Sequence, residues 1–145
     1  MTKMSKKEIR NFLRQGTLTG KLATVNKDGT PHVVPIWFVL DDYDNNDILL
    51  TTYQTSIKAK NIVRDSRVSI CIDDQAPPFT FVTVHGNAEI KHYKKRRLLN
   101  WATKIAERYM GKKKAKVYGR RNSTEGSVLV RIRPTRIIAE KNVAD

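Results

Sequence analysis

The chain has 145 residues, a length that suits one domain able to bury roughly two-thirds of its unfolded surface. Its single cysteine, Cys71, excludes an internal disulfide and a zinc site built from cysteines, and its apolar neighbours predict a buried free thiol. No stretch reaches the roughly 20 apolar residues of a membrane helix, and residues 1–10 lack the apolar core of a signal peptide. We therefore expect one cytoplasmic domain, residues 1–145, with no membrane partner.

The formal net charge is +14, and most of it comes from one segment. Residues 91–121 hold thirteen Lys and Arg against a single acid, Glu107, which gives this segment a net charge of +12. A field of this sign attracts phosphates, polycarboxylates, nucleic acid or an acidic membrane surface. A solvated helix face and loop would explain the same charges without any partner.

The first elements in chain order are a short helix and a hairpin. Ser5-Lys6-Lys7-Glu8 has the spacing of a capping box, so residues 1–16 are predicted to form an N-terminal helix. Asp28-Gly29 separates two β-rich runs, residues 21–25 and 31–40. A turn of this type between two such runs predicts a β-hairpin.

Two more strands, residues 48–53 and 67–72, are predicted on either side of a short helix that Thr55 or Ser56 can cap and that reaches about Arg64. Residues 79–90 then alternate apolar and polar side chains, as a half-buried strand does. Gly86 interrupts this run and predicts a bulge or a sharp bend.

The clearest helix is residues 94–110, where apolar side chains recur every three or four positions. Residues 112–127 are predicted to be a mobile basic loop, so residues 94–126 form a basic helix-and-loop insertion, and a last strand covers residues 127–133. About six strands and three helices at hairpin spacing predict a mostly β, α+β fold built on a small antiparallel barrel.

A group of hydroxyl, amide and ammonium side chains follows the strand at residues 48–53 and could hold an anion. Its members are Thr51, Thr52, Ser56, Lys58, Lys60 and Asn61. The first-turn amides of a helix carry a partial positive charge that favours a phosphate. An ordinary capped helix with solvated lysines explains the same pattern, and spacing alone favours this simpler explanation.

The end of the hairpin offers a second candidate surface. Pro35 removes one donor from a strand ladder and therefore indicates an edge, a bend or a bulge. Exposed backbone around Pro35, Ile36 and Trp37 could bond the edge of a planar heterocycle while an aromatic ring packs nearby, although core packing also explains Trp37. His32, His85 and His92 are scattered, no catalytic or metal-binding pattern is visible, and we assign no catalytic residue and no metal.

Several short motifs occur together in a fixed order. They are Leu22-Ala23-Thr24-Val25, Asp28-Gly29-x-Pro31, Val34-Pro35-Ile36-Trp37-Phe38, Thr51-Thr52, Lys58-x-x-Asn61, Arg67-Val68-Ser69, Phe81-Val82-Thr83-Val84-x-Gly86-x-Ala88-Glu89-Ile90 and Val130-Arg131-Ile132-Arg133-Pro134. In order and spacing, the chain resembles the pyridoxamine 5'-phosphate oxidase-like split-barrel family, and it looks closest to the branch of probable coenzyme F420-dependent enzymes.

The resemblance implies a six-stranded split barrel that forms a homodimer and binds FMN or F420 in grooves between the protomers. It implies that Lys58 and Asn61, with Thr51 and also Thr52 and Ser56, bind the cofactor phosphate, and that backbone around residues 35–37 meets the ring system. Relatives often carry an arginine just before the lysine matched by Lys58, whereas this chain has Thr55-Ser56-Ile57. Phosphate binding is then weaker, or is shared with Lys60 or the basic loop.

The function implied by the resemblance is hydride transfer between the cofactor and a small organic substrate, with chemistry supplied by the cofactor. The lack of an acid or base motif leaves open a non-catalytic carrier or sensor of the same cofactor. A nucleic-acid-binding protein has weaker support, because the basic loop offers few aromatic side chains besides Tyr118. Haem binding, known among distant split-barrel relatives, has the least support of these functions.

Overall fold

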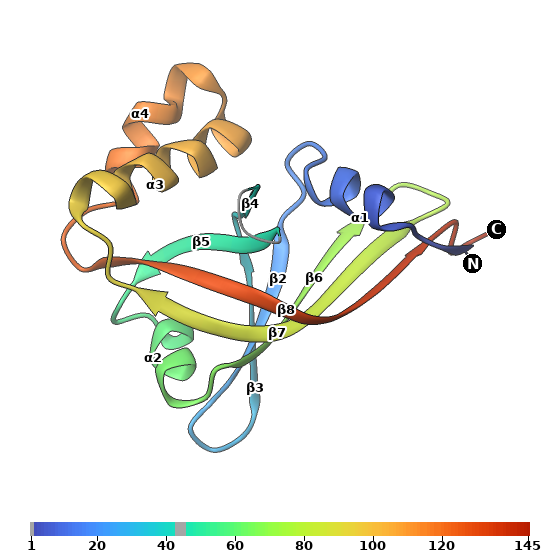
Figure 1. The fold of residues 1–145 in the computed structure, drawn as a ribbon, viewed down its shortest axis with the longest axis horizontal. Helices are drawn as coiled ribbons and strands as arrows, with labels where there is room; N and C mark the ends of the chain where they lie inside the picture. The colour runs from blue at the N-terminus through green and yellow to red at the C-terminus, as the bar shows by residue number, and fades with distance from the viewer. Residues whose placement is uncertain (1, 43–45) are drawn as a thin grey trace.

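The computed structural model describes residues 2–42 and 46–145, and within them it contains eight strands and four helices (Figure 1). The strands are β1 (Thr2–Lys3), β2 (Gly20–Val25), β3 (Pro31–Ile36), β4 (Val39–Asp41), β5 (Asp47–Tyr53), β6 (Arg67–Asp74), β7 (Thr80–Lys91) and β8 (Ser127–Lys141). The helices are α1 (Lys6–Leu13), α2 (Ile57–Arg64), α3 (Lys95–Met110) and α4 (Lys112–Arg121). The predicted α+β class is confirmed, although the predicted numbers of strands and helices were too low.

The strands form one antiparallel sheet in the order β3-β2-β6-β7-β8-β5-β4, with β1 paired to β8. Strands β3 and β4 lie at the two ends of this order, and no pairing joins them in the described part of the chain. The predicted barrel is therefore not closed by strand pairing, and the strands form an open sheet. The long strands β7 and β8 bend across the molecule, and α3 and α4 lie together beyond β5 (Figure 1).

The bend in the long strands has its cause at Gly86, where the predicted bulge is confirmed. The register of β7 on β8 shifts between His85 and Gly86. A Cβ on Gly86 would lie 2.3 Å from the carbonyl oxygen of Arg133, so a larger residue would force the two backbones apart. Pro134 pairs with Gly86, and its missing donor falls where the ladder is already irregular.

One face of the sheet packs against α1 and the segment around Phe38 to form the main core. The capping box at Ser5 and Glu8 begins α1 as predicted, and this helix buries Phe12 and Leu13. The alternation in β7 is also confirmed, since Val82 and Val84 are fully buried. Cys71 lies between the buried Ile70 and Ile72 and faces the other side of β6, so it is half-buried, and the prediction of a buried thiol was wrong.

The predicted mobile loop over residues 112–127 was also wrong, because most of it is the helix α4. This helix packs on α3 through Ala115 and Gly119, and a Cβ on Gly119 would lie 2.3 Å from the Thr103 hydroxyl oxygen. Most of the remaining side chains are exposed cations, so the sequence carries no apolar period that would reveal a helix. Contact with α3 supplies the stabilisation that the local sequence lacks.

Two strand boundaries also differ from the predictions. The run at residues 31–40 is two strands, since β3 ends at Ile36 and β4 begins at Val39. The last strand continues past residue 133 to Lys141, because its second half pairs with β7 beyond the bulge. Trp37 and Phe38 lie in the break between these two strands.

Candidate functional site

A cavity of about 640 Å³ lies where β3 and β5 end, beside α2 and the last turn of α4. Six of the nine predicted site residues line it, namely Pro35, Ile36, Trp37, Thr51, Thr52 and Lys58. Cavities of roughly 300–1,000 Å³ suit small-molecule ligands and cofactors. The structure therefore gathers residues from two separate strands and a helix into one space of suitable size.

Thr52 and Ser56 shape the cavity where β5 leads into α2. The Thr52 hydroxyl donates to the Ser56 hydroxyl over 3.0 Å, and that same oxygen accepts a bond of 3.2 Å from the amide of Ala59. Ser56 thus caps α2 as predicted. These bonds set the start of the helix, and with it the position of Lys58 in its first turn.

Lys58 is the cation that α2 contributes to the cavity. Its side chain is half-buried, and burial lowers the pKa of its ammonium from the ordinary value. No described carboxylate forms an ion pair with it, and no Asp or Glu is among the described residues that line the cavity. A partly desolvated cation without a protein partner favours an anionic ligand.

Asn61 and Lys60, two further residues predicted to bind the phosphate, lie outside the cavity lining. Asn61 is 3% exposed, and its amide nitrogen donates to Thr24 over 3.0 Å and to Asn26 over 2.9 Å. Its amide oxygen accepts two bonds of 3.2 Å from Arg64. Asn61 therefore ties α2 to β2, while Lys60 is exposed outside the cavity lining, and their predicted contacts with a phosphate stay predictions.

Trp37 lines another part of the cavity. Strand β3 is at an end of the sheet order, as Pro35 indicated, so one of its backbone edges has no strand neighbour among the described residues. The Trp37 ring stacks on Tyr109 of α3, with centroids 5.1 Å apart and planes inclined by 6°. Tyr109 donates from its hydroxyl to the carbonyl of Leu18 over 2.9 Å and accepts from the amide of Phe38 over 3.2 Å. Helix α3 thereby holds the Trp37 wall in place.

Arg108 fastens the same part of α3 to the sheet and to the end of α1. Its guanidinium donates to four backbone carbonyls, those of Leu13, Gln15, Gly16 and Phe38. Burial lowers the pKa of this guanidinium from its ordinary value. No local sequence pattern indicated this role, because the partners of Arg108 lie 70 to 95 residues away.

The cavity also has lining residues that sequence reasoning missed. They are Thr19, Tyr53, Ile105, Arg121, Asn122 and Ser127. Arg121 and Asn122 close the cavity from the end of α4, a segment predicted to be a loop. The one available signal was the general suggestion that the basic segment shares the binding of an anion.

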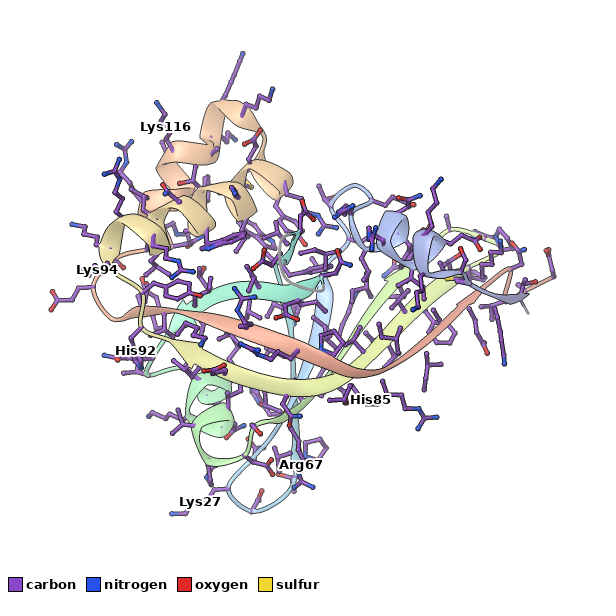
Figure 2. All side chains as sticks on the ribbon, viewed as in Figure 1. Lys27, Arg67, His85, His92, Lys94 and Lys116 are labelled. Carbon is purple, nitrogen blue, oxygen red and sulfur yellow. The ribbon has the colours of Figure 1, made fainter. Side chains whose placement is uncertain are left out.

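The residues that the structure describes offer neither a metal site nor a membrane-spanning helix. Within residues 2–42 and 46–145, no group of three or more His, Cys, Asp or Glu is placed to hold a metal ion. His85 bonds to the Ser69 hydroxyl over 2.6 Å and lies well apart from His92 (Figure 2). None of the helices described is long and apolar enough to cross a membrane.

The sheet and the cavity agree with a comparison against known families. The pyridoxamine 5'-phosphate oxidase family model matches residues 5–140, nearly the whole chain. The chain therefore belongs to the pyridoxamine 5'-phosphate oxidase family.

Among individual proteins, the chain is similar to a 5a,11a-dehydrotetracycline/5a,11a-dehydrooxytetracycline reductase of Streptomyces rimosus. The two are 33% identical over 91 residues, which cover 59% of this chain and 62% of the reductase. The match thus spans about three-fifths of that relative's length.

Two solved structures are also similar. A conserved hypothetical protein from Mycobacterium tuberculosis is 31% identical, with a TM-score of 0.83 over 96% of this chain and 86% of its own. A structure described as an F420 reductase is 26% identical, with a TM-score of 0.71 over 88% of this chain and 94% of its own.

Proposed function

We propose that the protein is an oxidoreductase that binds coenzyme F420 or FMN in the cavity beside Lys58 and transfers hydride to or from a small organic molecule. The observation that carries this proposal is the half-buried Lys58, which has no carboxylate partner among the described residues and lies beside the hydroxyls of Thr51 and Thr52. Such a group of donors suits a phosphate. The similarity to an F420 reductase favours the deazaflavin.

The residues present fit the parts of such a cofactor. Thr51, Thr52 and Lys58 would bind its phosphate, while the free edge of β3 at Pro35 and Ile36 would meet its ring system. Trp37, held by Tyr109, would pack beside that ring and exclude water. The cofactor would supply the hydride chemistry, and the chain would bind and orient it.

A carrier or sensor of the same cofactor is the second candidate. The described lining of the cavity contains no His, Asp, Glu or Cys, which are the side chains that most often act as general acids and bases. This composition suits storage as well as reactions in which the cofactor does the chemistry. The two candidates therefore differ in turnover and not in binding.

Titration of the purified protein with FMN and with F420, followed by fluorescence, tests the proposal. We expect a dissociation constant in the micromolar range or below for one of them, and binding of neither would contradict the proposal. Steady-state turnover of the reduced cofactor with quinones, enones and nitro compounds then separates an enzyme from a carrier. Turnover with none of these acceptors would favour the carrier.

We also propose that the protein is a homodimer with the cofactor sites at the protomer interface. The support is a set of exposed apolar side chains near the cavity elements, with Val33 of β3 at 59%, Ile57 of α2 at 56% and Val63 of α2 at 77% exposure. An interface formed by these elements would bury the three side chains. Light scattering should give twice the 16.6 kDa chain mass, and the mass of a single chain would contradict the dimer.

A further inference from the structure

We propose that Arg121, at the end of α4, is a second cation that binds the phosphate of the cofactor, in place of the arginine that is absent before Lys58. This inference rests on the proposed function and extends it to a residue outside the hairpin and α2. The sequence left two possible sources for the missing charge, Lys60 or the basic segment. The structure separates them, because Arg121 lines the cavity and Lys60 does not.

The position of Arg121 is set by the packing of α4. Gly119 lies so close to Thr103 of α3 that no side chain fits between them, and the hydroxyl of Ser123 donates to the carbonyl of Gly119 over 2.7 Å. The amide of Asn122 bonds back to the carbonyl of Tyr118 over 2.9 Å and ends the helix. The backbone at Arg121 is therefore held firmly at the cavity.

Aromatic contacts direct the side chain. The guanidinium carbon of Arg121 lies 5.4 Å from the centroid of the Tyr118 ring, and that ring lies 6.3 Å from the centroid of Trp37. A guanidinium near an aromatic face is attracted to it and loses little further freedom when it binds a ligand. The segment that follows α4 also reaches the proposed phosphate-binding residues, because Ser127 pairs with Tyr53, next to Thr52.

The charges at the cavity also favour an anionic ligand. Arg121 is exposed and, like Lys58, has no ion pair with a described residue. Two cations without a carboxylate in the described lining give the cavity a positive charge that only an anionic ligand balances. Lys94 and Lys116 of the basic segment are exposed and add to this field (Figure 2).

The test compares Arg121→Ala with Arg120→Ala, which removes an exposed arginine of the same helix turn that does not line the cavity. Dissociation constants are measured for FMN, F420 and riboflavin, which lacks the phosphate. Arg121→Ala should weaken binding of FMN or F420 by about 5- to 10-fold and leave riboflavin unchanged, while Arg120→Ala should change each by less than about twofold. Arg121→Lys should restore part of the loss, because it keeps the charge without the fork of donors.

Three results would overturn the inference. One is an Arg121→Ala variant that behaves like Arg120→Ala towards every ligand. Another is an equal loss for riboflavin, because that would assign Arg121 to the ring or to the shape of the cavity. If the wild-type protein binds none of the three ligands, the proposed function fails and the inference fails with it.

Discussion

Replacing Arg131 by alanine should lower the free energy of unfolding by about 3–5 kcal/mol. Arg131 is 5% exposed and donates from one guanidinium nitrogen to Asp47 over 3.1 Å and from the other to Asp41 over 2.9 Å. Both aspartates are equally buried, at 3% and 5% exposure. The substitution would leave two carboxylates close together in the interior without the cation between them, which is the costly way to break a buried ion pair. Urea unfolding with linear extrapolation measures the change.

The matched control is Arg133→Ala, two residues along the same strand. Arg133 is exposed and its only ion pair in the described chain is with Glu89 at 3.5 Å, so the expected loss is less than about 1 kcal/mol. Equal losses for the two variants would show that the Arg131 cluster does not stabilise the fold. The difference matters for function because β5, which carries Asp47, also carries Thr51 and Thr52 of the cavity.

Replacing Lys58 by alanine should raise the dissociation constant of FMN or F420 by roughly 10- to 150-fold. A hydrogen bond to a charged group contributes about 1.5–3 kcal/mol, and a half-buried ammonium lies at the upper part of that range. The control is Lys104→Ala on α3, whose ammonium lies over Trp101 and outside the cavity lining. Fluorescence titration should give a change below about twofold for this control. Equal effects of the two substitutions would contradict the placement of the phosphate.

The dependence of binding on pH provides a second readout for Lys58. Burial lowers the pKa of its ammonium, so the folded protein without ligand loses this proton at a lower pH than an ordinary lysine does. Affinity for an anionic cofactor should therefore be retained below that lowered pKa and fall as the pH rises through it. The Lys58→Ala variant should lack this alkaline loss. A wild-type affinity that stays constant into the range of ordinary lysines would argue against a role for the charged form.

The elements near the cavity differ in how well the sequence predicted them. The hairpin of β2 and β3, the strand β5 and the capped start of α2 were predicted because their signals are local. A turn residue, an alternating pattern or a hydroxyl at a helix start acts over a few positions. Helix α4 was missed because its stability comes from contact with α3, and its own side chains are mostly exposed cations.

The residues of the candidate site also differ in how well the sequence predicted them. Lys58 and Trp37 were predicted from motifs and do line the cavity, whereas Asn61 belongs to a network with Thr24 and Asn26 that no local pattern announces. Arg121 is one of thirteen cations in residues 91–121. Only the three-dimensional structure shows which of them lines the cavity. The family resemblance suggested that phosphate binding is either weaker or shared with Lys60 or the basic loop, but not which residue of that loop would take part.

The amino-acid sequence alone determined the α+β class, the family resemblance, the hairpin of β2 and β3, the end of β5 and the polar start of α2, since each depends on neighbouring residues. The tertiary structure decided that the sheet stays open, that α4 forms and that Arg121 reaches the cavity. It also paired Arg131 with Asp41 across 90 residues and Tyr109 with Leu18 across 91. Such contacts depend on how distant segments pack, and their energies are absent from any short stretch of the chain.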